Sequence, residues 1–138
     1  MKKIIYGIAA CLAIVAAGCA TKGKTVSSAN LSGEWKIAQL KDSVLPSQPA
    51  EPLTITFETS DSTFSAQTGC NIIGGKFVVG ENSFKFDNMF STRMMCPDMY
   101  VEETLSQLLP DVTSCETGTN GELVFFNADK KQLITLKK

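Results

Sequence analysis

Two short stretches gather most of the side chains in this chain that could do chemistry. They are Gly69-Cys70-Asn71 and Thr92-Arg93-Met94-Met95-Cys96. Thiolates act as nucleophiles, and together with thioethers they suit Cu(I). The sulfur ligands available for such a copper site are Cys70, Met94, Met95, Cys96 and Met99. We favour a disulfide between cysteines, with the methionines filling gaps in the core, and we therefore predict no metal site.

The absence of histidine narrows the possible chemistry further. It excludes Ser/His/Asp and Cys/His catalytic arrangements and every metal site that uses imidazole. Glu102 and Glu103 are adjacent in a helical pattern, but neighbouring helix positions point in different directions and do not form an acid–base pair. We expect no catalytic residue and no cofactor, and we predict that the protein is not an enzyme.

The N-terminus has the pattern of an export signal. Met1-Lys2-Lys3 is positively charged, and the apolar run 4–17 has the length of a signal-peptide core. The run ends in Ala16-Ala17-Gly18-Cys19, which resembles the lipobox of bacterial lipoproteins. The resemblance implies that residues 1–18 are removed and that Cys19 becomes an N-terminus acylated with chains such as palmitate.

This N-terminus predicts a cell-envelope protein whose membrane contact is its lipid. Two or more acyl chains hold a protein stably on a bilayer. Asp after the acylated cysteine is the familiar inner-membrane retention signal, and Ala20 stands there instead. We therefore expect the outer membrane, facing the periplasm. Removing Lys2 and Lys3 takes the formal net charge from −1 to −3, so the sequence indicates no nucleic-acid partner.

One domain follows a short tether. Residues 19–30 form the acylated N-terminus and a small, polar segment that predicts a flexible tether, and the domain is expected over residues 31–138. Strand-like runs bounded by turn residues are 34–40, 53–58, 63–68, 72–79, 83–87, 112–116, 122–126 and 132–136. They predict a mainly β (α+β) fold, a curled antiparallel sheet or partly open small barrel of about eight short strands. Gly74-Gly75 predicts a bulge or a close backbone approach.

One packed helix is expected near residues 97–109. Pro97 suits the first helical position, and Asp98 suits the positive end of a helix dipole. Apolar residues then recur at helical spacing, at Val101, Leu105, Leu108 and Leu109. Pro110 ends the pattern.

The cysteines of the domain, Cys70, Cys96 and Cys115, allow three pairings in the oxidising compartment that export implies. We favour Cys70–Cys96, because Cys70 follows a glycine at a strand junction and Cys96 precedes the helix. Closing this loop is worth about 3–4 kcal/mol in the chain-entropy model. Cys115 is then a buried free thiol, and we expect Asn71 and Arg93 to hydrogen-bond loop backbone near the disulfide.

A larger set of residues carries a family resemblance. It comprises Leu31-Ser32-Gly33-Glu34-Trp35, Gly69-Cys70-Asn71, Gly75, Thr92-Arg93-Met94-Met95-Cys96 and Glu102. In this order and spacing, residues 31–138 resemble the META domain family, which includes HslJ-like bacterial lipoproteins. The resemblance implies a β-rich, barrel-like fold with one packed helix. It also implies a link to envelope stress, such as heat shock, drug resistance or secretion, and no established catalytic activity.

Two functional hypotheses follow. The first is a non-enzymatic, lipid-anchored envelope protein that binds another envelope component. The second is a carrier of a small apolar ligand in a barrel cavity. The aromatic side chains that could line or fill such a cavity are Phe57, Phe64, Phe77, Phe84, Phe86, Phe125 and Phe126. We favour the first hypothesis, because a domain of this size needs its phenylalanines for the core.

Overall fold

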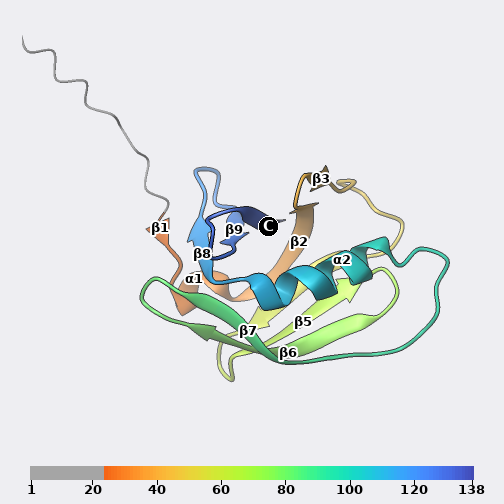
Figure 1. The fold of residues 1–138 in the computed structure, drawn as a ribbon, viewed down its shortest axis with the longest axis horizontal. Helices are drawn as coiled ribbons and strands as arrows, with labels where there is room; N and C mark the ends of the chain where they lie inside the picture. The colour runs from red at the N-terminus through yellow and green to blue at the C-terminus, as the bar shows by residue number, and fades with distance from the viewer. Residues whose placement is uncertain (1–23) are drawn as a thin grey trace, which may run out of the picture.

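The computed structural model describes residues 24–138, and Figure 1 shows how they are arranged. The predicted signal peptide, the predicted lipidation site Cys19 and the first residues of the predicted tether lie outside the described residues. Within residues 24–138, no helix is both long and apolar enough to cross a membrane.

The described residues form one antiparallel sheet that curls into a half-barrel (Figure 1). The order of strands is β1-β8-β9-β10-β2-β4-β5-β6-β7, with β3 beside β2. Their bounds are β1 Lys24–Thr25, β2 Gly33–Leu40, β3 Ser43–Val44, β4 Leu53–Glu58, β5 Thr63–Thr68, β6 Ile72–Val79, β7 Phe84–Ser91, β8 Ser114–Thr117, β9 Leu123–Phe126 and β10 Gln132–Lys137. The predicted fold class is confirmed, with eight main strands at the predicted places and two short additions, β1 and β3.

The main helix, α2 (Tyr100–Leu108), lies across the curled sheet (Figure 1) and buries Leu105 and Leu108. It begins three residues later than predicted. Asp98 Oδ1 accepts a hydrogen bond from the backbone N–H of Tyr100 at 3.0 Å, and such a side-chain bond holds the chain in a turn rather than a helix. After α2 the chain tightens into a 3₁₀ turn, η1 (Leu109–Asp111), at the proline that ends the predicted pattern.

The packed part of the chain begins before residue 31. β1 pairs with β8, and a single helical turn, α1 (Ser28–Leu31), leads into β2. Val26 is 4% exposed and Leu31 is fully buried. The indole Nε1 of Trp35 donates a hydrogen bond to the carbonyl of Leu31 at 2.7 Å. Residues 24–30, which we assigned to the tether, thus belong to the domain. Their polar composition predicted a tether, and the buried Val26 among them was not recognised as a core residue.

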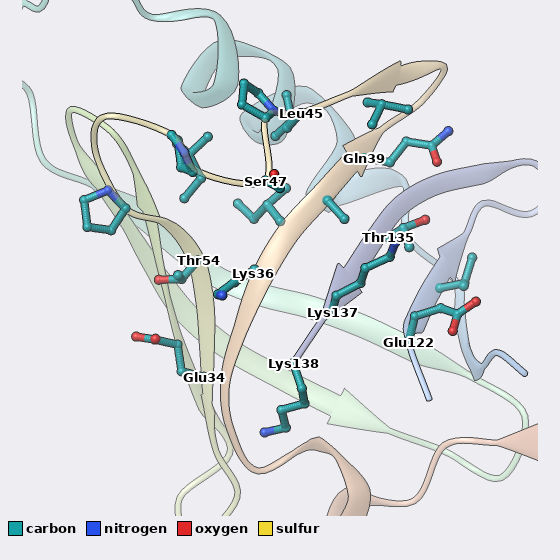
Figure 2. A pocket seen from close by; sticks show the side chains of 18 of the residues that line it. Glu34, Lys36, Gln39, Leu45, Ser47, Thr54, Glu122, Thr135, Lys137 and Lys138 are labelled. Atoms are coloured by element: carbon teal, nitrogen blue, oxygen red, sulfur yellow. The ribbon is translucent and has the colours of Figure 1, made fainter. Parts of the chain in front are cut away.

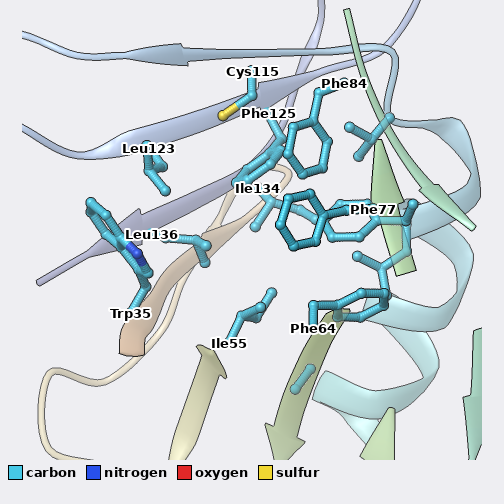
Figure 3. Packing of buried hydrophobic residues seen from close by; sticks show 14 of the residues in the cluster. Trp35, Ile55, Phe64, Phe77, Phe84, Cys115, Leu123, Phe125, Ile134 and Leu136 are labelled. Carbon is cyan, nitrogen blue, oxygen red and sulfur yellow. The ribbon is translucent and has the colours of Figure 1, made fainter. Parts of the chain in front are cut away.

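Phenylalanine rings fill the inside of the half-barrel (Figure 3). The buried rings are Phe57, Phe64, Phe77, Phe84, Phe86 and Phe125. Neighbouring centroids lie between 4.7 Å (Phe64 to Phe86) and 6.3 Å (Phe57 to Phe125) apart, the range in which aromatic pairs attract. Phe126 is only half-buried. Of the seven phenylalanines considered as the lining or filling of a cavity, the structure therefore places six against one another, as core.

The glycine pair in β6 lies at an irregularity, as predicted. The register between β6 and β7 shifts between Gly74 and Lys76. A Cβ atom on Gly75 would lie 2.8 Å from the carbonyl oxygen of Asp87, a separation that real Cβ atoms avoid. Gly75 therefore lets the backbone of β7 approach closely, and the shift changes which side chains of β7 face outward.

The thiol of Cys115 lies in the core (Figure 3) and is 5% exposed. Burial, and then the nearby carboxylate of Glu116, raise the pKa of this thiol far above its usual range. Because the thiolate is the reactive form, we expect the peptide containing Cys115 to stay unmodified by iodoacetamide at pH 8 in the folded protein, and to be modified in denaturant. Peptide mass mapping measures both states. Rapid modification of the folded protein would contradict the buried position.

Candidate functional site

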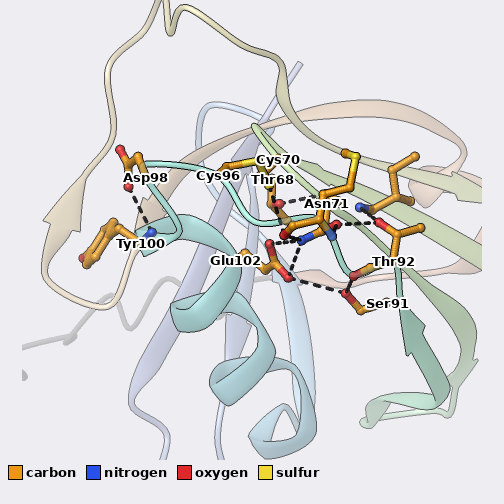
Figure 4. Close-up of a disulfide and its surroundings, with 11 residues drawn as sticks. Thr68, Cys70, Asn71, Ser91, Thr92, Cys96, Asp98, Tyr100 and Glu102 are labelled. Atoms are coloured by element: carbon orange, nitrogen blue, oxygen red, sulfur yellow. Dashed lines mark hydrogen bonds between the residues drawn. A yellow bond between two sulfur atoms is a disulfide. The ribbon is translucent and has the colours of Figure 1, made fainter.

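A disulfide joins the two stretches that could do chemistry (Figure 4). Cys70 lies at the turn between β5 and β6, and Cys96 lies in the segment that leads to α2. Their Cα atoms are 6.0 Å apart and 26 residues apart in sequence. The predicted pairing is confirmed, and Cys115 is the free cysteine among residues 24–138.

The side chain of Asn71 is the centre of the hydrogen bonds beside the disulfide (Figure 4). Asn71 is 1% exposed. Its Oδ1 accepts hydrogen bonds from Thr92 Oγ1 at 2.9 Å and from the backbone N–H of Met94 at 2.7 Å. Its Nδ2 donates to the carbonyl of Met94 at 2.9 Å and to Glu102 Oε2 at 2.8 Å. The whole hydrogen-bonding capacity of this amide is therefore used within the protein.

Glu102 links this cluster to the helix. Its carboxylate, on the first turn of α2, accepts from Asn71 Nδ2 and more weakly from Ser91 Oγ at 3.5 Å. The N-terminal end of a helix favours a negative charge, which suits this position. The salt bridge found among residues 24–138 is Lys85–Asp87, so Glu102 is held there by hydrogen bonds and not by an ion pair.

The structure brings together some of the motif residues and not others. The clasp, as we name the arrangement, consists of Gly69, Cys70, Asn71, Thr92, Met94, Cys96 and Glu102. Trp35 lies in the core instead, with Lys138 Nζ 4.4 Å from the centre of its ring. Gly75 lies at the bulge of β6. The expected backbone hydrogen bonds are made by Asn71, whereas Arg93 is exposed and its guanidinium has no hydrogen bond within the described residues.

The clasp offers little for redox or copper chemistry in this state. The sulfur atoms of Cys70 and Cys96 are bonded to each other, so neither is a thiolate ligand. Met94 and Met95 are 57% and 94% exposed and do not fill gaps in the core as we expected. The sulfur-rich stretch thus places two flexible apolar side chains in solvent.

These methionines extend an exposed apolar surface beside the clasp. We name it the apolar rim: Ile72, Phe90, Met94 and Met95, which are 43%, 65%, 57% and 94% exposed. Phe90 pairs with Gly74, and its ring lies over that glycine. The carbonyl of Ile72 accepts from the backbone N–H of Thr92 at 3.1 Å, so Ile72 lies beside the segment that connects Phe90 to Met94. Several exposed apolar side chains in one region of the surface are typical of interaction sites.

Phe90 is the member of the rim that the sequence analysis missed. The predicted strand ended at residue 87, whereas β7 continues to Ser91. The alternation of residues 84–87 predicted a strand there. The register shift opposite Gly75 breaks this alternation in the later residues of β7, so the pattern did not indicate that the strand continues. Because one extra residue moves every later side chain to the other face, the outward position of Phe90 could be found only from the pairing with β6.

Comparisons with known proteins agree on the fold. A family model described as the META domain matches residues 29–138. No curated protein matches the chain significantly. A protein solved by NMR is 21% identical, with a TM-score of 0.62, over 81% of this chain and 94% of that one. An NMR structure of a protein from Burkholderia xenovorans is 16% identical, with a TM-score of 0.62, over 99% and 97%. A crystal structure of a DUF4847 family protein from Bacteroides vulgatus is 18% identical, with a TM-score of 0.51, over 78% and 92%.

The clasp predicts a large loss of stability when Asn71 is truncated. Asn71→Ala leaves the backbone N–H of Met94 and the carboxylate of Glu102 without their partner, so we expect the free energy of unfolding to fall by about 2–4 kcal/mol. Chemical denaturation of the oxidised protein measures it. Gln107→Ala, at an exposed position of α2, is the control and should change stability by less than about 0.5 kcal/mol. Equal stability of the two variants would contradict the role of Asn71.

Proposed function

Because this chain belongs to the META domain family, we propose that it is a non-enzymatic binding module, held at the cell envelope by a lipid on Cys19. The observation that carries the proposal is the apolar rim on the clasp. The rim exposes four large apolar side chains, and the disulfide and the Asn71 hydrogen bonds fix the backbone below them. A fixed backbone lowers the entropy lost when a partner binds.

The non-enzymatic part of the proposal is supported by how the reactive groups are used. The thiols nearest the rim are bonded to each other, and the carboxylate of Glu102 accepts hydrogen bonds from Asn71. A general base or nucleophile needs a free lone pair aimed at a substrate. In the clasp these groups stabilise the loop instead.

The proposed partner is another envelope protein. β7 ends the order of strands, so much of one side of this strand is unpaired within residues 24–138. Its start is bonded elsewhere, since the N–H of Phe84 donates to the carbonyl of Thr113 at 3.0 Å. The rim lies at the other end of β7, where Phe90 is. An open edge next to apolar side chains suits a partner that adds an extended segment to the sheet.

The envelope location and a role in stress belong to the same proposal. The lipobox-like sequence before Cys19 and Ala20 after it support attachment to the outer membrane, facing the periplasm. Family resemblance supports a role in envelope stress, such as heat shock or drug resistance. The alternative of a ligand carried inside the barrel gains no support from the phenylalanines, because six of them pack against one another.

The lipid anchor is tested by Cys19→Ser. Without the thiol that takes up the lipid, we expect the exported protein to move from the membrane fraction to the soluble fraction. Fractionation with an antibody against the domain measures this distribution. The domain itself should keep the Cys70–Cys96 disulfide, which non-reducing electrophoresis verifies. A Cys19→Ser protein that stays with membranes would contradict lipidation.

The rim is tested by photo-crosslinking in living cells. A photoreactive amino acid at position 95 should form a discrete adduct with a partner protein, and Phe90→Ser should reduce its yield severalfold by removing the largest side chain of the rim. The matched control is the same photoreactive group at Val78, an exposed apolar residue outside the rim. Equal adducts from both positions, or no effect of Phe90→Ser, would contradict the rim as the binding surface.

A further inference from the structure

A second surface lies on the outer face of the sheet, away from the clasp. It is a groove of about 820 Å³ over β9, β10, β2 and β4 (Figure 2). Side chains alternate along a strand, so Trp35 of β2 enters the core while its neighbours Glu34 and Lys36 line the groove. The loop between β3 and β4 forms one wall. The volume falls in the range of small-molecule binding sites.

Two lysines lie directly opposite each other on the floor of the groove. Lys36 of β2 pairs with Lys137 of β10, and both line the groove. Like charges at facing positions of an antiparallel pair repel. Figure 2 shows the two side chains extending apart, Lys36 toward Thr54 and Lys137 toward Thr135. Within residues 24–138, neither ammonium group has a salt-bridge partner. Two neighbouring positive charges are thus left available to an anion.

A buried hydroxyl group lies beside the first of these lysines. Thr54 of β4 pairs with Lys36 and also lines the groove. Its side chain is 7% exposed, and its Oγ1 has no hydrogen-bond partner within the described residues. Buried hydroxyl groups are normally hydrogen-bonded, and an unpartnered one is costly. An anion held by Lys36 would give this hydroxyl an acceptor.

The lining contains three further charged side chains, those of Glu34, Glu122 and Lys138. Lys138 Nζ donates to the carbonyl of Ser32 at 3.0 Å. Glu122 Oε2 accepts from the backbone N–H of Asn120 at 3.0 Å, within its turn. Glu34 is two residues before Lys36 on β2 and forms no salt bridge within residues 24–138. The lining thus holds three lysines and two glutamates, which leaves it net positive, and Lys36 and Lys137 are the lysines without a hydrogen bond or salt bridge within residues 24–138.

The wall beside the lysine pair is apolar. Its side chains are Val44, Leu45, Pro46, Pro49 and Leu53. Val44 is 78% exposed, and the prolines fix the backbone of the loop. An apolar wall next to two positive charges is complementary to an amphiphile, a molecule with an anionic head and a hydrocarbon chain.

From these features we propose that the groove binds a single-chain lipid phosphate. A phosphate monoester carries a charge between about −1.5 and −2 at neutral pH. This charge balances two ammonium groups, whereas the single charge of a carboxylate head group balances one. Lysine binds phosphate as a point charge on a flexible stem, so both side chains can turn toward a head group between them. The hydrocarbon chain lies along the wall formed by the β3–β4 loop. The groove shares no residue with the apolar rim. A negative result for lipid phosphate binding would therefore leave the proposal of a protein partner at the rim unaffected, and the reverse also holds.

The proposal is tested with dodecyl phosphate below its critical micelle concentration. The protein is the full chain carrying Cys19→Ser in detergent-free buffer, and the measurements are calorimetric titration and the fluorescence of Trp35, the only tryptophan. We expect binding at least about tenfold tighter than that of inorganic phosphate, dodecanoate or dodecyl maltoside. Octyl phosphate, which is four methylenes shorter, should bind more than about tenfold more weakly.

Variants identify the site. Lys36→Gln with Lys137→Gln should weaken binding of dodecyl phosphate by at least about tenfold, without lowering the stability of the unliganded protein, because a repulsion is removed. The matched control is Lys76→Gln, an exposed lysine of β6 outside the groove, which should leave the affinity unchanged. Equal binding of dodecyl maltoside would show an apolar surface only. That result, tighter binding of dodecanoate, an unchanged affinity in the double variant, or no binding at all would overturn the proposal.

Discussion

The buried amide of Asn71 connects three parts of the fold that are far apart in the sequence. It bonds to the backbone at Met94, to the hydroxyl of Thr92 and to the carboxylate of Glu102. A buried amide with every donor and acceptor used specifies one arrangement, since any other leaves polar groups unpaired. The strand junction, the segment before the helix and the helix itself therefore adopt one relative position. The disulfide beside the amide closes the loop between Cys70 and Cys96 and so lowers the conformational entropy of the unfolded chain.

The rest of the half-barrel depends on aromatic packing under this connection. The rings of Phe57, Phe84 and Phe125 are almost completely buried, and Leu105 and Leu108 of α2 are buried in the same core. Without a position fixed for α2, these leucines would have no defined partners among the rings. The clasp and the core are thus complementary, because the clasp places the helix and the core supplies most of the apolar burial.

The sequence alone predicted the strands well because most of them alternate cleanly. In Leu53–Glu58, the side chains of Ile55 and Phe57 enter the core as their spacing predicts. The start of α2 lies three residues later than predicted, because Asp98 Oδ1 accepts a hydrogen bond from the N–H of Tyr100 in a turn that precedes the helix. The hydrogen bonds of Asn71 could not be derived from spacing, since they join residues up to 31 positions apart. The groove escaped prediction for a related reason: Lys36, Thr54 and Lys137 come together only through the register of three strands.

In the proposed lipid-anchored protein, the pairing of β1 with β8 limits how far this domain can lie from a bilayer. Four residues lie between the proposed acylated Cys19 and Lys24, where β1 begins, and each of the five steps from Cys19 to Lys24 spans at most about 3.6 Å in an extended chain. The first strand can therefore lie no more than about 18 Å from the lipid attachment point. In the proposed anchored protein, so short an attachment would keep the β1–β8 edge close to the membrane surface. The anchored edge would then limit which surfaces of the domain a partner can reach, in addition to setting where the protein is held.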